Sequence, residues 1–203
     1  CSAHTGYKIN LKWVEAGETE EYNEQAFKEL FNGVHAVIVP GGFGSRGVEG
    51  KIKAVRYCRE NKIPYLGICY GMQLAVVEFA RHICGLERAN TTEVDPQTPH
   101  PVICILPEKR DVKNIGGTLR LGACTAHLQP GSVMHRTYNE YTNSERHRHR
   151  YEVNPEYHDV LVKNGLVLCG MSPDRKLVEF IELPETTHPY FVGCQGHIEL
   201  KST

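Results

Sequence analysis

The sequence predicts an α/β fold: a mostly parallel open sheet with helices on both faces, plus extra antiparallel strands in the second half. Between residues 34 and 85, short β-branched runs alternate with apolar residues at helical spacing, an order typical of a parallel sheet. After residue 100 the apolar runs are strand-like, with turn signals such as Asn164-Gly165 between them. We see no repeat or linker in the 203 residues, so we expect one domain over 1–203.

The first strand is expected at residues 8–14, where Ile9, Leu11 and Trp13 alternate with polar residues. The next ten residues, 15–24, are polar and acidic. They indicate a loop or the start of a helix.

Residues 34–85 contain the strand–helix alternation. Residues 34–39 are a β-branched run that predicts a buried strand. Apolar residues from position 48 recur at helical spacing, and this helix should end near residue 61, before Ile63-Pro64. Residues 65–68 predict a second buried strand and residues 72–83 an apolar helix. Further strands are expected at residues 102–106, 118–121, 160–168, 177–183 and 190–195.

Composition narrows the classes of function. Lys plus Arg is 23 and Asp plus Glu is 24, for a net charge of −1, which argues against general binding to nucleic acid or a membrane surface. No apolar run approaches the ~18–20 residues that span a bilayer, and no signal-peptide pattern is seen. The eight cysteines form no C-x-x-C pair. We therefore expect a cytoplasmic protein with reduced, mostly buried cysteines and no metal site.

Cys69 is the candidate nucleophile. It lies in Gly67-Ile68-Cys69-Tyr70-Gly71, between a predicted strand and a predicted helix, which is the context of a nucleophile elbow. The helix N-terminus favours a thiolate, and the Tyr70 amide can donate to an oxyanion. The alternative is a buried cysteine between two structural glycines.

A cysteine nucleophile needs a base and a group that orients it. His197 and Glu199 are two residues apart after a predicted strand, so in an extended chain both side chains point to the same side. Together with Cys69 they form a candidate triad. In isolation, the pair is more typical of a protein surface.

Residues 42–47 fit the G-x-G-x-x-G pattern of dinucleotide-binding loops. That motif also requires an acidic residue about 20 positions further on, where this chain has Ile68-Cys69-Tyr70. The pattern of a phosphate-binding P-loop does not fit either, because the chain has Ser45 where that motif requires glycine and Ile52 where it requires serine or threonine. We instead interpret the segment as a glycine turn whose Gly42 amide completes an oxyanion hole.

Several segments together resemble class I glutamine amidotransferases and, within that class, the glutaminase domains of CTP synthases. The elbow and the glycine turn are shared across the class, whereas two later stretches are more specific. The segments are residues 40–44, 66–73, 90–93, 116–122 and 145–154. One departure is His197-Ile198-Glu199-Leu200, where the family usually has H-P-E-F.

The resemblance implies a flavodoxin-like fold and a set of roles. Cys69 would attack the side-chain amide of L-glutamine and form a thioester, releasing ammonia. His197 would act as general base and acid, oriented by Glu199. The remaining implied residues hold the oxyanion or bind glutamine: Gly42, Phe43, Tyr70, Gly71, Gln73, Glu93 and Arg150.

The resemblance also implies partners. In the family, a separate N-terminal synthetase domain, absent from this chain, uses ATP and Mg²⁺ to aminate UTP to CTP, a C–N ligase reaction of pyrimidine biosynthesis. GTP activates the glutaminase through a lid loop, and residues 111–116 look short for that loop. The full-length enzyme is expected to be a homo-oligomer, a tetramer. No cofactor, nucleic acid or membrane is implied for this domain.

Other interpretations remain. Residues 146–150 are basic and fit a solvated loop, a weak nucleic-acid patch, or a carboxylate clamp formed by Arg150, and we favour the clamp. His147 and His149 are expected to be structural. The chain could also be another Cys–His hydrolase of the same fold, such as a γ-glutamyl hydrolase, or an inactive regulatory module.

Overall fold

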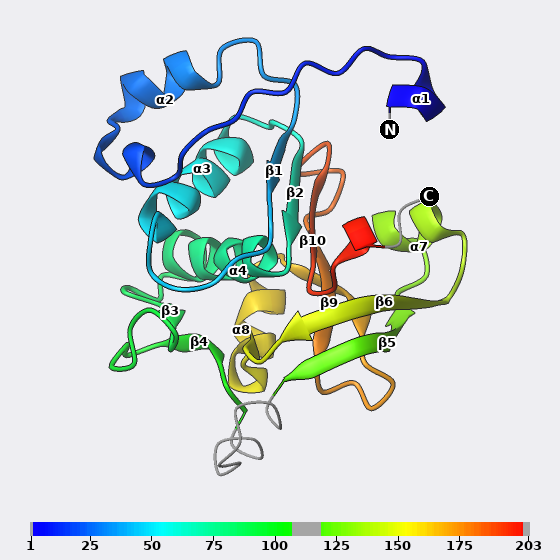
Figure 1. Ribbon diagram of the computed structural model, residues 1–203. Helices are drawn as coiled ribbons and strands as arrows, with labels where there is room; N and C mark the ends of the chain where they lie inside the picture. The colour runs from blue at the N-terminus through cyan, green and yellow to red at the C-terminus, as the bar shows by residue number, and fades with distance from the viewer. Residues whose placement is uncertain (1, 107–118, 201–203) are drawn as a thin grey trace.

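The computed structural model describes residues 2–106 and 119–200, which form an α/β fold with two sheets (Figure 1). The larger sheet has the strand order β1-β2-β10-β9-β8-β5-β6, and the smaller has the order β3-β4-β7. The strands are β1 Val37–Val39, β2 Tyr65–Ile68, β3 Asn90–Thr91, β4 Pro101–Cys104, β5 Arg120–Leu128, β6 Thr142–His149, β7 Glu152–Val153, β8 Val167–Met171, β9 Val178–Glu182 and β10 Phe191–Cys194.

The larger sheet is mixed: the antiparallel strands expected in the second half are confirmed, but the expectation of a mostly parallel sheet is wrong. Only β1, β2 and β10 are parallel neighbours in it, and the pairings from β10 through β9, β8 and β5 to β6 are antiparallel. Parallel neighbours need a crossover connection, which a helix provides between β1 and β2. The later strands β8 and β9 are joined by the expected turn at Pro173-Asp174, which favours antiparallel pairing.

Two helices pack beside the parallel strands. In α3, Val48–Glu60, the buried positions include Val48, Ile52, Val55 and Cys58, as the apolar spacing predicts. In α4, Tyr70–His82, every residue from 70 to 80 is buried. The other helices are α1 Ser2–Thr5, α2 Glu24–Leu30, α7 Val133–Tyr138 and α8 His158–Lys163, with 3-10 turns η1 Glu18–Glu21, η2 Pro155–Tyr157 and η3 Ile198–Leu200.

Two expected strands differ from the structure. Residues 8–14 form no strand, and Ile9, Leu11 and Trp13 are exposed, because alternation stabilises a strand only where a neighbour pairs with it. Residues 160–168 are split between α8 and β8. The Asn164-Gly165 signal marks this break, since Gly165 has a φ of 100° and Asn164 caps α8.

The basic stretch 146–150 is also not a loop. Its first four residues belong to β6, which pairs with β5 over eight residue pairs. The expected strand at 118–121 is the start of β5, although residue 118 itself lies outside the described residues, as do residues 111–116.

Candidate active site

Cys69 lies between β2 and α4 in a strained backbone conformation, with φ 50° and ψ −100°. A non-glycine residue with positive φ costs about 1–3 kcal/mol and is held there by its surroundings. The flanking glycines make the turn possible. A Cβ on Gly71 would lie 2.1 Å from the carbonyl oxygen of Val39, and one on Gly67 would lie 2.7 Å from the Gly71 backbone. The structure therefore confirms the strand–turn–helix context predicted for Cys69.

The Cys69 thiol is buried and neutral in this environment. Its pKa is raised to about 12, chiefly by burial and also by the carboxylates of Glu199, Glu152 and Glu93. The backbone amide of Tyr70 lowers the pKa through a hydrogen bond. The helix N-terminus thus acts in the direction that we expected, but burial outweighs it, so a base must remove the thiol proton.

His197 and Glu199 are hydrogen-bonded, with 2.6 Å between His197 Nδ1 and Glu199 Oε1. Glu199 lies in the turn η3 rather than in an extended segment. Because a carboxylate accepts the bond, Nδ1 carries the proton and Nε2 can act as a base. The His197 ring packs against Gly41, where a Cβ would lie 2.7 Å from Cε1.

The glycine turn is held in place from two sides. The Tyr70 hydroxyl donates to the carbonyl oxygen of Gly44 at 2.5 Å, and the Gly44 amide donates to Glu93 Oε1 at 2.9 Å. The Lys51 ammonium lies 5.4 Å from the centre of the Tyr70 ring. These contacts fix the turn that carries Gly42 beside the first turn of α4.

A cavity of about 300 Å³ opens beside Cys69 and brings together residues from distant segments. The predicted site residues in its lining are Gly42, Phe43, Cys69, Gln73, Glu93 and Arg150. The other lining residues, Leu119, Leu121, Arg148 and Tyr151, were not predicted as site residues, and His149, expected to be structural, also lies in the lining. The other predicted site residues, Tyr70, Gly71, His197 and Glu199, are not part of this lining.

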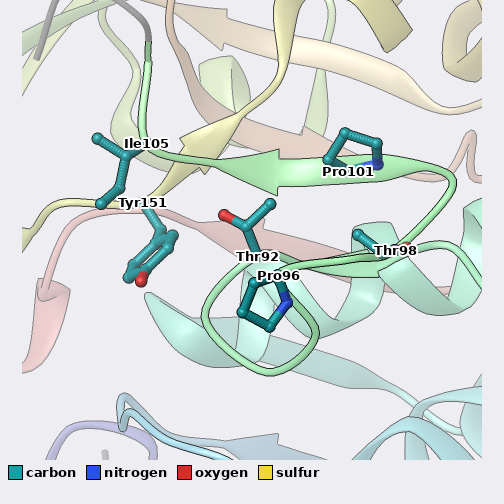
Figure 2. Close-up of a pocket in the computed structure, with 6 residues that line it drawn as sticks. All are labelled: Thr92, Pro96, Thr98, Pro101, Ile105 and Tyr151. Carbon is teal, nitrogen blue, oxygen red and sulfur yellow. The ribbon is translucent and has the colours of Figure 1, made fainter. Parts of the chain in front are cut away.

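A second cavity of about 460 Å³ lies beside β4 (Figure 2). Figure 2 shows side chains from the β3–β4 connection, from β4 and the residue after it, and from the β6–β7 connection around it. The lining is Thr92, Pro96, Thr98, Pro101, Ile105 and Tyr151. Among the described residues of this lining there is no thiol, imidazole or carboxylate. Tyr151 is common to both cavities.

A buried charged cluster adjoins the first cavity. Arg120 binds Glu179 at 2.6 Å and Glu152 at 3.4 Å, and His147 Nδ1 lies 2.8 Å from His149 Nε2. Burial, Arg120 and His197 lower the pKa of His147 to about 3. The period-2 alternation of Arg and His along 146–149 is the signal for this cluster, because alternate residues of a strand face the core.

Among the described residues, no group of three or more His, Cys, Asp or Glu side chains is placed to hold a metal ion. The cysteines that the structure describes are all free. None of the helices in the described part of the chain is long and apolar enough to cross a membrane.

The structure thus contains a cysteine on a strained strand–helix turn, a histidine hydrogen-bonded to a carboxylate, and a glycine turn beside the first turn of α4. Residues 1–203 match the family model described as Glutamine amidotransferase class-I, so the chain belongs to this family.

Its relatives narrow the assignment. The CTP synthase of Methanococcus maripaludis is 54% identical over 208 residues, covering 100% of this chain and 38% of that protein. The CTP synthase of Methanococcus aeolicus is 52% identical, covering 96% and 36%. A solved structure described as the glutaminase domain of Trypanosoma brucei CTPS with bound acivicin is 34% identical, with a TM-score of 0.91, covering 100% of this chain and 78% of that one.

Within its class, the chain therefore belongs with the glutaminase domains of CTP synthases. It spans little more than a third of the length of the curated relatives that it matches.

Proposed function

We propose that this chain hydrolyses L-glutamine to glutamate and ammonia through a thioester on Cys69, and that the ammonia serves the amination of UTP to CTP in a longer enzyme. The observation that carries the proposal is the position of Cys69. Its strained turn borders a cavity that is also lined by Glu93 and Arg150.

The charges of the cavity suit an amino acid. The Glu93 carboxylate can bind the α-ammonium group of glutamine, and the Arg150 guanidinium can bind its α-carboxylate in a bidentate manner. A glutamine held at that end would direct its side-chain amide toward a nucleophile, and Cys69 supplies the one thiol among the described residues of the lining.

The reaction proceeds in two balanced steps. His197 Nε2 takes the Cys69 proton, Sγ bonds to the amide carbon, and the C–N bond breaks as His197 returns the proton to the leaving ammonia. Water then attacks the thioester, releasing glutamate and restoring the thiol. The amides of Gly42 and Tyr70 donate to the oxyanion of each tetrahedral intermediate. Glu199 keeps the His197 ring in the tautomer that both steps require.

The ammonia acceptor lies in a different part of the longer enzyme. A synthetase domain would activate UTP with ATP and Mg²⁺, and the complete enzyme would assemble as a tetramer. GTP would act as the activator of the glutaminase. The lid segment expected to respond to GTP, residues 111–116, lies outside the described residues.

The nucleophile can be tested by labelling this chain with a diazoketone analogue of glutamine, followed by mass spectrometry. We expect one adduct, on Cys69, and protection by excess glutamine. Cys194→Ala is the matched control, because Cys194 is also a buried free cysteine and its labelling should equal that of the wild type. An adduct on another cysteine, or none, would contradict the proposal.

The coupling to CTP formation can be tested in the full-length enzyme. Cys69→Ala should abolish glutamine-dependent CTP formation and spare the ammonia-dependent reaction, because the two reactions occupy different domains. If both rates fell together, Cys69 would instead support folding or domain docking.

A further inference from the structure

We propose that Gln195 is a further catalytic residue, whose side-chain amide donates a hydrogen bond to Sγ of Cys69 and stabilises the thiolate. The inference rests on the proposed role of Cys69 as nucleophile. Gln195 directly follows β10 and is fully buried, with 0% of its surface exposed. Its Nε2 lies 3.8 Å from Cys69 Sγ.

A chain of hydrogen bonds sets the orientation of the Gln195 amide. Gln73 Nε2 lies 3.1 Å from the carbonyl oxygen of Tyr151, which can only accept, so this end of Gln73 is the nitrogen. The same nitrogen lies 3.2 Å from the Gln195 amide, which must present its oxygen there. The Gln195 nitrogen is therefore the atom that faces Cys69.

The backbone holds both partners in register. The backbone amide of Cys69 donates to the carbonyl oxygen of Cys194 at 2.7 Å. The backbone amide of Gln195 donates to the carbonyl oxygen of Glu179 at 2.8 Å. These bonds join the nucleophile turn to the end of β10. A buried side chain anchored at its backbone and at its amide oxygen retains little freedom to move away from the sulfur.

The surroundings of the sulfur explain why a donor is useful there. Carboxylates of Glu93, Glu152 and Glu199 raise the pKa of Cys69, and burial raises it most. The Tyr70 amide opposes them. The other titratable groups around the cavity are Arg148, His149, Arg150 and Tyr151. A neutral amide donor lowers the cost of the thiolate without adding a charge that substrate binding must then accommodate.

The test is the pH dependence of Cys69 alkylation by iodoacetamide, followed at Cys69 by mass spectrometry. Gln195→Met keeps the length of the side chain but removes the donor. We expect the midpoint of the rate–pH profile to rise by about one pH unit, from the typical strength of a hydrogen bond to a charged group. Cys194→Ala is the control for disturbance at the same end of β10, because the Cys194 side chain packs in a separate apolar cluster. This variant should keep the wild-type midpoint.

Gln195→Leu serves if Gln195→Met does not fold. It also removes the donor and places no charge beside the sulfur, so its midpoint should rise as well. A folded variant with the wild-type midpoint would overturn the role of Gln195. A wild-type Cys69 that does not react at any pH would instead contradict the proposed function, which keeps the two failures distinct.

Discussion

Glu93 and Gly44 are joined by a hydrogen bond of 2.9 Å from the Gly44 amide to the carboxylate, although 49 residues separate them in the chain. The carbonyl oxygen of Gly44 also accepts a bond from the Tyr70 hydroxyl. The carboxylate that we propose for the substrate ammonium therefore also holds the turn that carries Gly42. If the proposed roles hold, this one glycine links glutamine binding to the geometry of the oxyanion hole.

Glu93→Gln separates these two roles of Glu93. The side-chain amide oxygen of the new residue can still accept from the Gly44 amide, but the charge that attracts the α-ammonium group of the substrate is lost. We expect KM for glutamine to rise roughly 10- to 100-fold, with little change in kcat. Steady-state ammonia release measures this, and Glu87→Gln, an exposed carboxylate, is the control. A fall in kcat at constant KM would contradict the binding role.

Tyr70→Phe tests the other side of the turn. It preserves the backbone amide and the ring beneath Lys51 but removes the hydroxyl that binds Gly44. With the turn less firmly held, kcat should fall roughly 2- to 10-fold, the typical worth of one neutral hydrogen bond. Tyr141→Phe, at an exposed tyrosine, should leave kcat unchanged. Equal rates for both variants would show that the turn does not need this bond.

His197 and Glu199 should differ in importance. Replacing His197 with Ala removes the general base, which typically costs about 10²–10⁴-fold in rate. Glu199→Ala removes only the group that sets the tautomer, so its loss should be smaller. Ammonia release from both variants, after confirming that each still folds, gives the comparison. An equal and mild loss of rate in both variants would show that His197 and Glu199 are only a surface pair and not a catalytic base with its orienting group.

His147 should make the fold sensitive to acid. Its pKa is about 3 in the folded chain and about 6.5 in an unfolded one. The unfolded state therefore takes up a proton that the folded state refuses, and stability present above pH 6.5 is lost as the pH falls toward 3.

Urea unfolding of the wild type and of His147→Asn at several pH values measures this effect. The stability advantage of the wild type should shrink by roughly 1 kcal/mol per pH unit below about pH 6. His127→Asn, at an exposed histidine, should follow the wild-type profile. A difference between wild type and His147→Asn that does not vary with pH would exclude His147 as the titrating group.

The elements that could be predicted are those with strong local signals. The strand at 65–68 has the predicted bounds, and the helix from residue 48 ends one residue before Asn61. Residues 8–14 show the limit of such signals, because their alternation has no neighbouring strand to pair with. The sequence predicts the antiparallel strands of the second half but not their order, since the pairing of β10 with both β2 and β9 depends on the path of the whole chain.

The sequence by itself predicted the turn that carries Cys69, and Gly67 is required there by the backbone of the turn itself, whereas Gly71 is required by the distant Val39 carbonyl. It also determined the spacing of His197 and Glu199. Only the tertiary structure decided that Gln195 meets Cys69 across 126 residues, that Glu93 holds Gly44, and that His147 is buried. The physical reason is that turns and helices follow from neighbouring residues, whereas contacts between distant segments follow from how the strands are ordered in the sheets.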